Sequence, residues 1–344
     1  MYLTEKEIMS QHEALHKTYG YIWEKREEIR EFFGDGAKKV NVMGCGSSYM
    51  IAKSGQRMFA SCENGSANAI AGGDYLTNPE YYKNMVKGSI IISLSRSGRT
   101  TEMVRAIRHM KETTDCKVIS LSMIKENDLI PYADMNLTME WGYDESVCQT
   151  RTVTNLYLAV AMLYAICTGD DRLLSSLKRA VEQNETYKEE YRSVCKAIAE
   201  KEWGDVVVLA DGAVVGIAEE GALAFTEISM IPGHCFNILD YRHGPMVLNK
   251  EGTLTIMLIQ PGARELQKAM AEDVRSHNGV LITVSDEKEG PGNPDAHICI
   301  GDIGDYIAWG IPFINIIQMT AYEKAILKGT NPDAPTGLDA YITL

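Results

Sequence analysis

The stretch VNVMGCGSSYMIAKSGQRMF, residues 40–59, combines a short apolar run, a glycine turn and an amphipathic helix pattern. At an offset of 166 residues, the stretch VVVLADGAVVGIAEEGALAF, residues 206–225, repeats the same succession of features. The turn glycine Gly46 aligns with Gly212, and apolar residues match on both sides of it. We therefore expect a strand, a tight turn and a helix at both places.

A second pair of stretches supports the same relation between the two halves of the chain. GSIIISLSRSGRT from Gly88 aligns with GTLTIMLIQPGAR from Gly252, which again places two turn glycines together, Gly98 and Gly262. The two matches occur in the same order along the chain. The sequence therefore predicts two similar α/β subdomains that arose by internal duplication.

The remaining sequence alternates β-branched runs with helix patterns, which is typical of parallel α/β units. Five strands are predicted in the first half, over residues 39–43, 66–70, 89–94, 117–121 and 135–139, and five in the second half, over residues 205–209, 234–239, 253–259, 280–284 and 297–300. Helices predicted over 147–167 and 171–203 connect the halves. The predicted organisation is an N-terminal helical segment (1–35), a first subdomain (36–168), a linking helix (169–203), a second subdomain (204–330) and a C-terminal tail (331–344).

Composition limits the class of protein. The 344 residues are 45% hydrophobic, which is enough for two domains of roughly 150 residues each. The net charge of −13 disfavours nucleic acid as a partner, so a bound anion must be held by local groups. The longest apolar run, residues 156–167, is shorter than the roughly 20 residues of a membrane span, and the N-terminus lacks a signal-peptide pattern. We expect a soluble, cytoplasmic protein without membrane contact.

The cysteines and histidines give no sign of a metal or disulfide framework. The eight cysteines contain no CxxC pair and are expected to be reduced and mostly buried. His234 and His243 have no partner at a familiar ligand spacing, so no metal site is predicted. Neither GxGxxG nor GxxxxGK[ST] is present, and no cofactor is predicted.

Hydroxyl side chains cluster at two predicted strand-to-helix turns of the first half. Ser47 and Ser48 precede a helix expected to begin near Tyr49. A second group precedes the helix predicted over 102–110 and consists of Ser95, Ser97, Thr100 and Thr101. Helix N-termini and hydroxyls at the carboxyl edge of a parallel sheet bind anions, so this pattern favours a phosphate monoester. Ordinary helix capping is the alternative, but it accounts for only one hydroxyl per helix.

Comparison of the two halves indicates that the turns do not require these hydroxyls. The second half has ADGAV where the first has GCGSS, and IQP where the first has SRS. A turn needs its glycine but not its serines. We therefore interpret the first half as carrying a polar pocket that the second half lacks.

Candidate acid and base residues lie in the second half, in EEGALAFTEISM and DYRHGPM. Helical spacing places the carboxylates Glu220 and Glu227 on one face with the apolar residues Leu223, Ala224 and Ile231. Burial raises the pKa of a carboxylate toward the range in which it can move a proton on carbon. The alternatives are that either Glu pairs with a buried Arg or caps a turn. His243 follows Arg242 in a Gly-Pro turn, where it is either presented to a cleft or an ordinary surface residue.

Five motifs occur together in the chain: GCGSSY, SLSRSGRTTE, EEGALAFTEIS, RHGP and the closing GLDAYITL. In combination they resemble the SIS (sugar isomerase) family, in particular the isomerase domain of glucosamine-6-phosphate synthase and its stand-alone relatives. The resemblance covers the chain from about residue 35. It implies two flavodoxin-like subdomains, a sugar phosphate as ligand, and a homodimer with a shared active site.

The resemblance also implies roles for individual residues. Glu227 would be the base that moves the proton between C1 and C2, and His243 would assist ring opening, reaching the site from the neighbouring subunit as in the synthase. The segment SVCQTRTVTNL resembles a substrate-facing segment of the family, which brings Thr150 and Glu145 near the sugar. The full set expected to bind substrate is Cys45, Gly46, Ser47, Ser48, Ser95, Arg96, Ser97, Thr100, Thr150 and Glu220.

Two departures from the synthase limit the reaction. The synthase has a lysine at the position of Ala224 and another, in its C-terminal tail, at the position of Ala340. A Schiff base formed by the tail lysine is therefore not expected in this chain. We also expect no N-terminal glutaminase domain, and hence no internal source of ammonia. The leading hypothesis is a phosphosugar isomerase or deaminase, with a fructosamine-6-phosphate deglycase as alternative. A non-catalytic phosphosugar sensor and a plain interaction module are the remaining classes, the last of which leaves the hydroxyl clusters unexplained.

Overall fold

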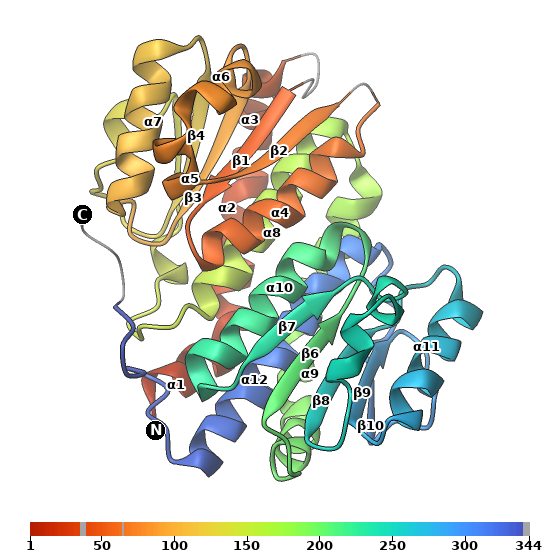
Figure 1. Ribbon diagram of the computed structural model, residues 1–344. Coiled ribbons are helices and arrows are strands. Elements are labelled where there is room, and N and C mark those ends of the chain that lie inside the picture. The colour runs from red at the N-terminus through yellow and green to blue at the C-terminus, as the bar shows by residue number, and fades with distance from the viewer. Residues whose placement is uncertain (35–38, 64, 340–344) are drawn as a thin grey trace. The chain divides into compact units, whose positions relative to one another are not determined.

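Two five-stranded parallel sheets, one in each half of the chain, organise the computed structural model (Figure 1). It describes residues 1–34, 39–63 and 65–339. The strand order is β2-β1-β3-β4-β5 in the first sheet and β10-β9-β8-β6-β7 in the second, and every neighbouring pair is parallel. Numbered from the first strand of each half, both orders are 2-1-3-4-5, the flavodoxin-like order. The predicted α/β class and the duplication are confirmed.

The first sheet belongs to a unit made mainly of residues 13–145 and 151–175, called here the first unit. Its strands are β1 (Lys39–Gly44), β2 (Ser66–Ala71), β3 (Ile90–Ser95), β4 (Lys117–Ser122) and β5 (Met135–Thr138). Its helices are most of α2 (Gln11–Glu24), then α3 (Arg26–Phe33), α4 (Ser47–Ala60), α5 (Gly72–Thr77), α6 (Pro79–Val86), α7 (Thr101–Thr113) and α8 (Arg151–Thr168).

The second unit comprises Met1–His12, Ser146–Thr150 and Ser176–Leu338. Its strands are β6 (Asp205–Leu209), β7 (Gly233–Phe236), β8 (Thr253–Leu258), β9 (Val280–Ser285) and β10 (Ala296–Cys299). Its helices are α1 (Leu3–Met9), most of α9 (Asp171–Ala199), α10 (Val215–Ala224), α11 (Arg264–Ser276) and α12 (Gly310–Lys328). The units differ from the predicted segments in that the helices before β1 are divided between them and most of α9 belongs with the second sheet.

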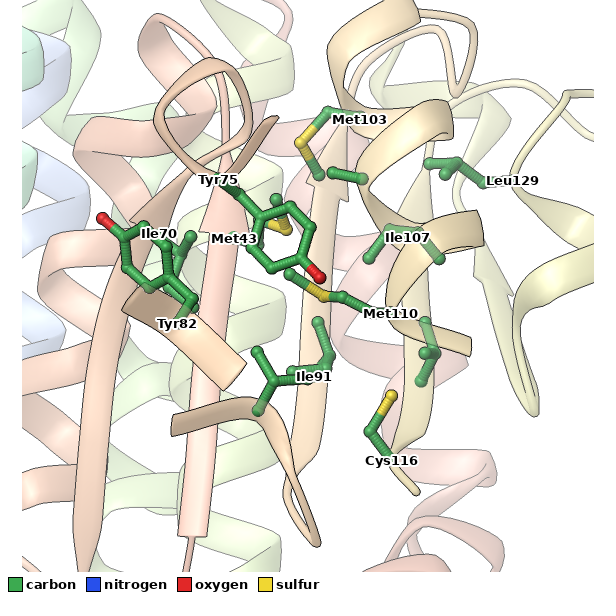
Figure 2. Packing of buried hydrophobic residues seen from close by; sticks show 13 residues of the cluster. Met43, Ile70, Tyr75, Tyr82, Ile91, Met103, Ile107, Met110, Cys116 and Leu129 are labelled. Atoms are coloured by element: carbon green, nitrogen blue, oxygen red, sulfur yellow. The ribbon is translucent and has the colours of Figure 1, made fainter. Parts of the chain in front are cut away.

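Alternating side chains of β1 serve the two faces of the first sheet. Met43 packs with Ile91 and with Ile107 of α7 in a buried cluster on one face (Figure 2). Val42 points to the other face, where α4 approaches so closely that a Cβ at Gly55 would lie 3.1 Å from a Val42 methyl group. The strand is therefore covered by helices on both sides, in agreement with the full burial of the neighbouring residues Val42 and Met43.

All ten predicted strands are present, and the differences are at element ends. β7 stops at Phe236 instead of Leu239, because the N–H of Ile238 donates to the Asp211 carboxylate instead of continuing the ladder. α8 begins at Arg151 instead of residue 147, since the Asp144 carboxylate accepts the N–H groups of Arg151 and Thr152 and starts the helix there.

The cysteines are free, as predicted, but they are less buried than expected. Cys116, Cys148 and Cys195 are buried, whereas the other five are partly exposed because they lie at strand ends and helix margins. Among the helices of the described residues, none has the length and apolar character to cross a membrane.

Core truncation provides a test of the packing in Figure 2. Ile107 is fully buried, so Ile107→Ala should lower the free energy of unfolding by about 2–5 kcal/mol. The matched control is Arg108→Ala on the same helix, whose side chain is 51% exposed, and it should change that free energy by less than about 0.5 kcal/mol. Urea unfolding followed by circular dichroism measures both. Equal effects of the two changes would contradict the assignment of this face to the core.

Candidate functional site

The strand order of the first sheet reverses between β1 and β3, which are direct neighbours. The chain leaves β1 at Gly44 for α4 on one face and leaves β3 at Ser95 for α7 on the other face. Turns that depart to opposite faces open a crevice at the carboxyl edge of the sheet, where α/β proteins bind ligands. Both hydroxyl-rich turns lie at this position.

The turn after β1 leaves the start of α4 without a side-chain cap. Gly46 is the N-cap residue with φ +54°, and Gly212 has φ +63° at the matching place in the second unit, so both aligned glycines have a positive φ. Ser47 and Ser48 are each 4% exposed and lie inside the first helical turn, earlier than the predicted start near Tyr49. Thr100 is the N-cap of α7 and its hydroxyl makes no capping bond. Helix capping therefore does not account for these hydroxyls.

Ser95 and Ser97 have a structural role that the sequence did not predict. The Ser95 hydroxyl accepts the N–H of Gly98 at 2.9 Å, and the Ser97 hydroxyl accepts the N–H of Arg99 at 3.1 Å. These bonds hold the turn, in which Gly98 has φ +63°. The interpretation that the turn does not need its serines is corrected: both hydroxyls stabilise the turn, and each still has a hydrogen and a lone pair to offer a ligand.

The two arginines of this turn differ in exposure and contacts. Arg96 is 5% exposed, and its guanidinium carbon lies 5.9 Å from the centre of the Tyr143 ring. Arg99 is exposed, and its Nη2 donates to the Glu126 carbonyl at 3.0 Å, away from the turn. Arg96 is thus the cation that the fold places at the turn, and Tyr143 is a neighbour that no sequence motif indicated.

Cys45 completes the first turn and is a neutral thiol. Burial, and next the Glu102 carboxylate, raise its pKa to about 11, although the backbone N–H groups of Gly72 and Gly73 act in the opposite direction. One carboxylate oxygen of Glu102 is buried without a hydrogen-bond partner in the described part of the chain. A thiol beside a carboxylate can donate a weak hydrogen bond but is not a nucleophile near neutral pH.

The matching turn after β8 in the second unit is filled by its own side chain. Gln267 of α11 is 2% exposed; its Oε1 accepts the N–H of Gln260 at 2.8 Å, and its Nε2 donates to the carbonyls of Gln260 and Gly262 at 3.1 and 2.5 Å. Ala263, with φ +51°, takes the left-handed conformation, so Gly262 does not play the part that its alignment with Gly98 predicted.

The turn after β6 is also occupied. The Asp211 carboxylate accepts hydrogen bonds from Asn237 Nδ2 at 2.8 Å and from the N–H of Ile238 at 3.2 Å. The nearby cation Arg264 pairs with Asp286 at 2.6 Å and with Glu287 at 3.3 Å. This crevice therefore holds an internal carboxylate and amide where the first unit presents hydroxyls.

The two candidate carboxylates of the second unit follow one another along a helix of changing geometry. Glu220 is 1% exposed on α10, whereas Glu227 is partly exposed in a π-helical turn, Phe225–Ser229. That turn ends at Met230, which has φ +52°, so Ile231 lies beyond the helix and does not share the predicted face. The widened turn changes the direction of Glu227 relative to regular 3.6-residue spacing, and such turns are frequent at functional sites.

His243 is exposed on a loop of the second unit. It ends a 3-10 turn, Asp240–Arg242, and its N–H donates to the Asp240 carbonyl at 2.9 Å. Gly244 follows with φ +125°, and Arg242 is fixed by an ion pair with Asp273 at 2.6 Å. Its exposure fits both expectations, presentation to a cleft and an ordinary surface position.

The structure places the predicted site residues in two groups. The first unit contains Cys45, Gly46, Ser47, Ser48, Ser95, Arg96, Ser97 and Thr100, all in the two turns at the β1–β3 crevice. The second unit contains Thr150, Glu220, Glu227 and His243. Thr150 is fully buried, and its carbonyl accepts a hydrogen bond from Gln318 Nε2 at 3.1 Å, whereas Glu145 is exposed. No group of His, Cys, Asp or Glu within the described ranges is arranged to hold a metal ion.

Comparison with known proteins gives a consistent picture. The model of the SIS domain family matches residues 36–166 and 201–322. Glutamine–fructose-6-phosphate aminotransferase (isomerizing) of Haemophilus influenzae is 25% identical over 371 residues, which cover 99% of this chain and 58% of that protein. The Aliivibrio fischeri enzyme of the same name is 26% identical, with coverage of 99% and 58%. The chain thus spans somewhat more than half the length of these relatives.

Solved structures share the fold over nearly their whole length. Tagatose-6-phosphate ketose/aldose isomerase of Escherichia coli superposes with a TM-score of 0.86 at 19% identity, covering 98% of this chain and 96% of that one. Glucosamine-6-phosphate deaminase of Thermotoga maritima gives 0.80 at 24% identity, covering 99% and 100%. At these identities the likeness is one of fold.

The raised pKa of Cys45 gives a test of the first turn. Only the thiolate reacts with iodoacetamide, so in the native protein the alkylation rate of Cys45 should keep rising with pH toward about 11. In the urea-denatured chain the same peptide should reach its maximal rate near the usual pKa of 9.0. Mass spectrometry of the peptide measures both profiles, and levelling near pH 9 in the native protein would contradict the buried, carboxylate-facing thiol.

Proposed function

The chain belongs to the SIS domain family, and we propose that it is a phosphosugar isomerase or deaminase acting on a hexose or amino-sugar 6-phosphate. The observation that carries the proposal is the β1–β3 crevice of the first unit. Two helices begin there without side-chain caps, and buried hydroxyls surround their N-termini. The positive ends of two helices, hydroxyl groups and one buried guanidinium together favour a phosphate monoester.

The matching crevice of the second unit supports this interpretation. It has the same strand order but is filled by Asp211 and Gln267. A duplicated fold therefore does not by itself leave an anion site open. We propose that each chain binds one phosphate, at the first sheet.

We propose Glu227 as the base in the reaction. Its carboxylate would remove the proton from C2 of the open-chain aldose. The electron pair would form the C1–C2 double bond while the C1=O π pair moves to O1, which takes a proton to give an enediol or enolamine. Return of the proton to C1 gives the ketose, or from an amino sugar the ketimine, which water hydrolyses to ammonia and the ketose phosphate. His243 would donate a proton to the ring oxygen during opening. Holding the phosphate makes the proton transfer effectively intramolecular, which lowers the barrier by several kcal/mol.

Ala224 supports isomerisation or deamination over ketose amination. It is 2% exposed in α10, where the resembling synthase has a lysine. Ala340, at the position of the second synthase lysine, lies outside the described residues. Neither proton transfer nor ketimine hydrolysis needs an amine at these positions. We also propose a homodimer, because His243 is exposed in a single chain and the resemblance assigns it to a neighbouring subunit's site.

A substrate panel tests the proposed reaction. The protein should convert at least one of glucosamine-6-phosphate, galactosamine-6-phosphate and tagatose-6-phosphate, with release of ammonia from the amino sugars. Proton transfer through a carboxylate should exchange deuterium from solvent into C1 or C2, which NMR detects. Release of an amine from a fructosamine-6-phosphate adduct would indicate a deglycase, and binding with neither turnover nor exchange would indicate a sensor.

Substitution of the proposed base is the second test. Glu227→Gln keeps the size of the side chain but removes the basic oxygen, so kcat should fall by about 10²–10⁴-fold while the Kd for sugar phosphate stays within about twofold. Glu219→Gln is the matched control, a partly exposed carboxylate on α10 that should keep wild-type kcat. Full turnover by Glu227→Gln would exclude Glu227 as the base.

A further inference from the structure

Hydrogen bonds join the loops that follow β3, β4 and β5 in the first unit. The N–H of Met123, directly after β4, donates to the Arg96 carbonyl at 3.0 Å, and the N–H of Met139, directly after β5, donates to the carbonyl of the last β4 residue at 2.9 Å. The chain then makes a 3-10 turn, Glu140–Gly142, which Tyr143 follows. Arg96 and the Tyr143 segment therefore lie along the same carboxyl edge of the first sheet.

The 3-10 turn brings the ring of Tyr143 back to Arg96. Gly142 lies directly against Met123, since a Cβ at Gly142 would be 2.8 Å from Met123 Sδ. The guanidinium carbon of Arg96 lies 5.9 Å from the centre of the half-buried Tyr143 ring, although β4 stands between their strands in the sheet. A cation is attracted to an aromatic face at this distance, and more strongly where water is excluded, as it is for the 5% exposed Arg96.

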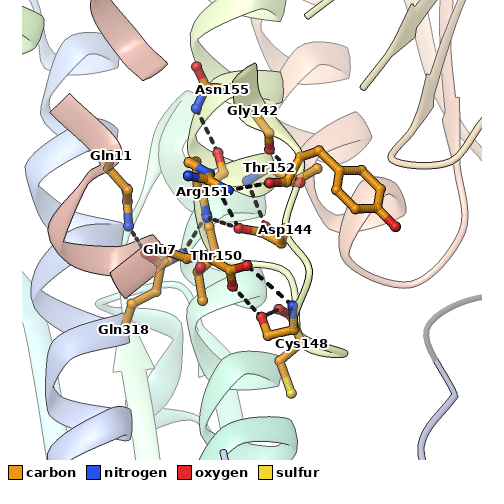
Figure 3. Close-up of polar contacts among 12 residues, drawn as sticks. Glu7, Gln11, Gly142, Asp144, Cys148, Thr150, Arg151, Thr152, Asn155 and Gln318 are labelled. Carbon is orange, nitrogen blue, oxygen red and sulfur yellow. Dashed lines mark hydrogen bonds and ion pairs between the residues drawn. The ribbon is translucent and has the colours of Figure 1, made fainter. Parts of the chain in front are cut away.

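Helix α8 holds the segment that carries Tyr143 (Figure 3). The fully buried Asp144 carboxylate accepts the N–H groups of Arg151 at 3.1 Å and Thr152 at 2.8 Å. In the opposite direction, the Thr152 hydroxyl donates to the Gly142 carbonyl at 2.7 Å, and Nη2 of Arg151 donates to the Tyr143 carbonyl. The backbone on both sides of Tyr143 is thus fixed to the first turn of one helix, within the first unit.

The ring contact gives Arg96 a fixed place at the turn without using its hydrogen-bond donors. A guanidinium donates its hydrogen bonds in its own plane, so an aromatic ring against its face leaves that plane to other partners. An anion in the β1–β3 crevice would then meet a cation that is already oriented. Less side-chain entropy is lost on binding when the binding group is ordered beforehand.

We propose that Tyr143 is a positioning residue that holds the Arg96 guanidinium in place for the phosphate of the substrate, and that the start of α8 holds Tyr143 in turn. The inference rests on the proposed function, which puts the phosphate at this turn. It adds to the anion site a residue from outside the two hydroxyl-rich turns.

Phosphate binding tests the role of the ring. Tyr143→Leu should raise the Kd of inorganic phosphate and of glucosamine-6-phosphate roughly three- to thirtyfold, and Tyr143→Phe, which keeps the aromatic face, should restore both to within about twofold of wild type. Titration followed by ³¹P NMR measures each Kd. An unchanged Kd in Tyr143→Leu would overturn the proposal. Equal weakening in Tyr143→Phe would assign the effect to the hydroxyl and would also overturn it.

The matched control is Tyr132→Leu. Tyr132 is a half-buried ring of the same unit that packs against the buried cluster around Ile107. Its loss should lower Tm but leave the Kd of both phosphate ligands within about twofold of wild type. A rise in Kd as large as that of Tyr143→Leu would mean that loss of any such ring weakens binding, and would contradict a specific role for Tyr143.

A double-mutant cycle shows whether the ring acts through the guanidinium. Arg96→Gln removes the charge and should itself weaken phosphate binding. In that background Tyr143→Leu should change the Kd far less than it does in the wild-type protein, because the cation that the ring positions is gone. The same factor in both backgrounds, with a lower Tm, would make Tyr143 a residue of the fold only and overturn its positioning role.

Variants of Arg151 test the part assigned to α8, and they replace Tyr143→Leu if that variant does not fold. Arg151→Ala removes the donor to the Tyr143 carbonyl and should raise the Kd in the same direction, whereas Arg151→Lys can still donate and should restore it. An unchanged Kd in Arg151→Ala would overturn the role of α8.

The wild-type titration separates this inference from the proposed function. If the wild-type protein binds neither inorganic phosphate nor glucosamine-6-phosphate, the phosphate site itself is overturned, and the proposed function with it. If the wild-type protein binds them and Tyr143→Leu binds them equally well, only the positioning role of Tyr143 is overturned.

Discussion

The parallel pairing of β1 with β3 is the constraint on which the candidate site depends. Parallel strands cannot be joined by hairpins, so each strand end sends the chain into a helix, and the 2-1-3-4-5 order sends the helices after β1 and β3 to opposite faces. The connections must be tight. A Cβ at Gly44 would lie 2.4 Å from the Ser48 backbone, so the strand end and the first turn of α4 are in direct contact. The N-terminus of α4 is consequently brought to the edge of the sheet, where the N–H groups of Ser48 and Tyr49 donate to the carbonyls of Cys45 and Gly46.

In both halves the strand order creates a crevice at the edge of the sheet, and the side chains around the crevice determine whether they fill it themselves. Both units have the reversed order and a left-handed glycine after the first strand, Gly46 or Gly212. In the second unit the Asp211 carboxylate and the Gln267 amide bind the turn backbone from within. In the first unit the matching positions have short hydroxyl side chains. The duplication thus supplies an internal comparison between a crevice filled by its own side chains and the proposed binding crevice.

The elements of the fold could be predicted because hydrophobic periodicity and glycine turns are local signals. These signals predict all ten strands, and the predictions are wrong only at strand ends. At Phe236, for example, a long-range hydrogen bond from the Ile238 N–H to the Asp211 carboxylate ends the pairing of β7. The site was less predictable, since its details are tertiary contacts. Neither the π-helical turn at Glu227 nor the ring of Tyr143 beside Arg96 is indicated by the spacing of residues in the sequence. The sequence indicates the hydroxyls of Ser95 and Ser97 as candidate binding groups, but it does not predict their hydrogen bonds to the N–H groups of the turn.

The charge of the chain explains why the crevice relies on neutral donors. A net charge of −13 produces a long-range field that opposes the approach of a phosphate, and Arg99 is already engaged with the Glu126 carbonyl. Arg96 is buried beside Tyr143, so its charge acts at short range, while hydroxyl and N–H groups act only on contact. Binding then depends on how well the donors fit a tetrahedral anion instead of on attraction at a distance. The proposed site would select a phosphate by shape and would release it, because no excess of positive charge holds it.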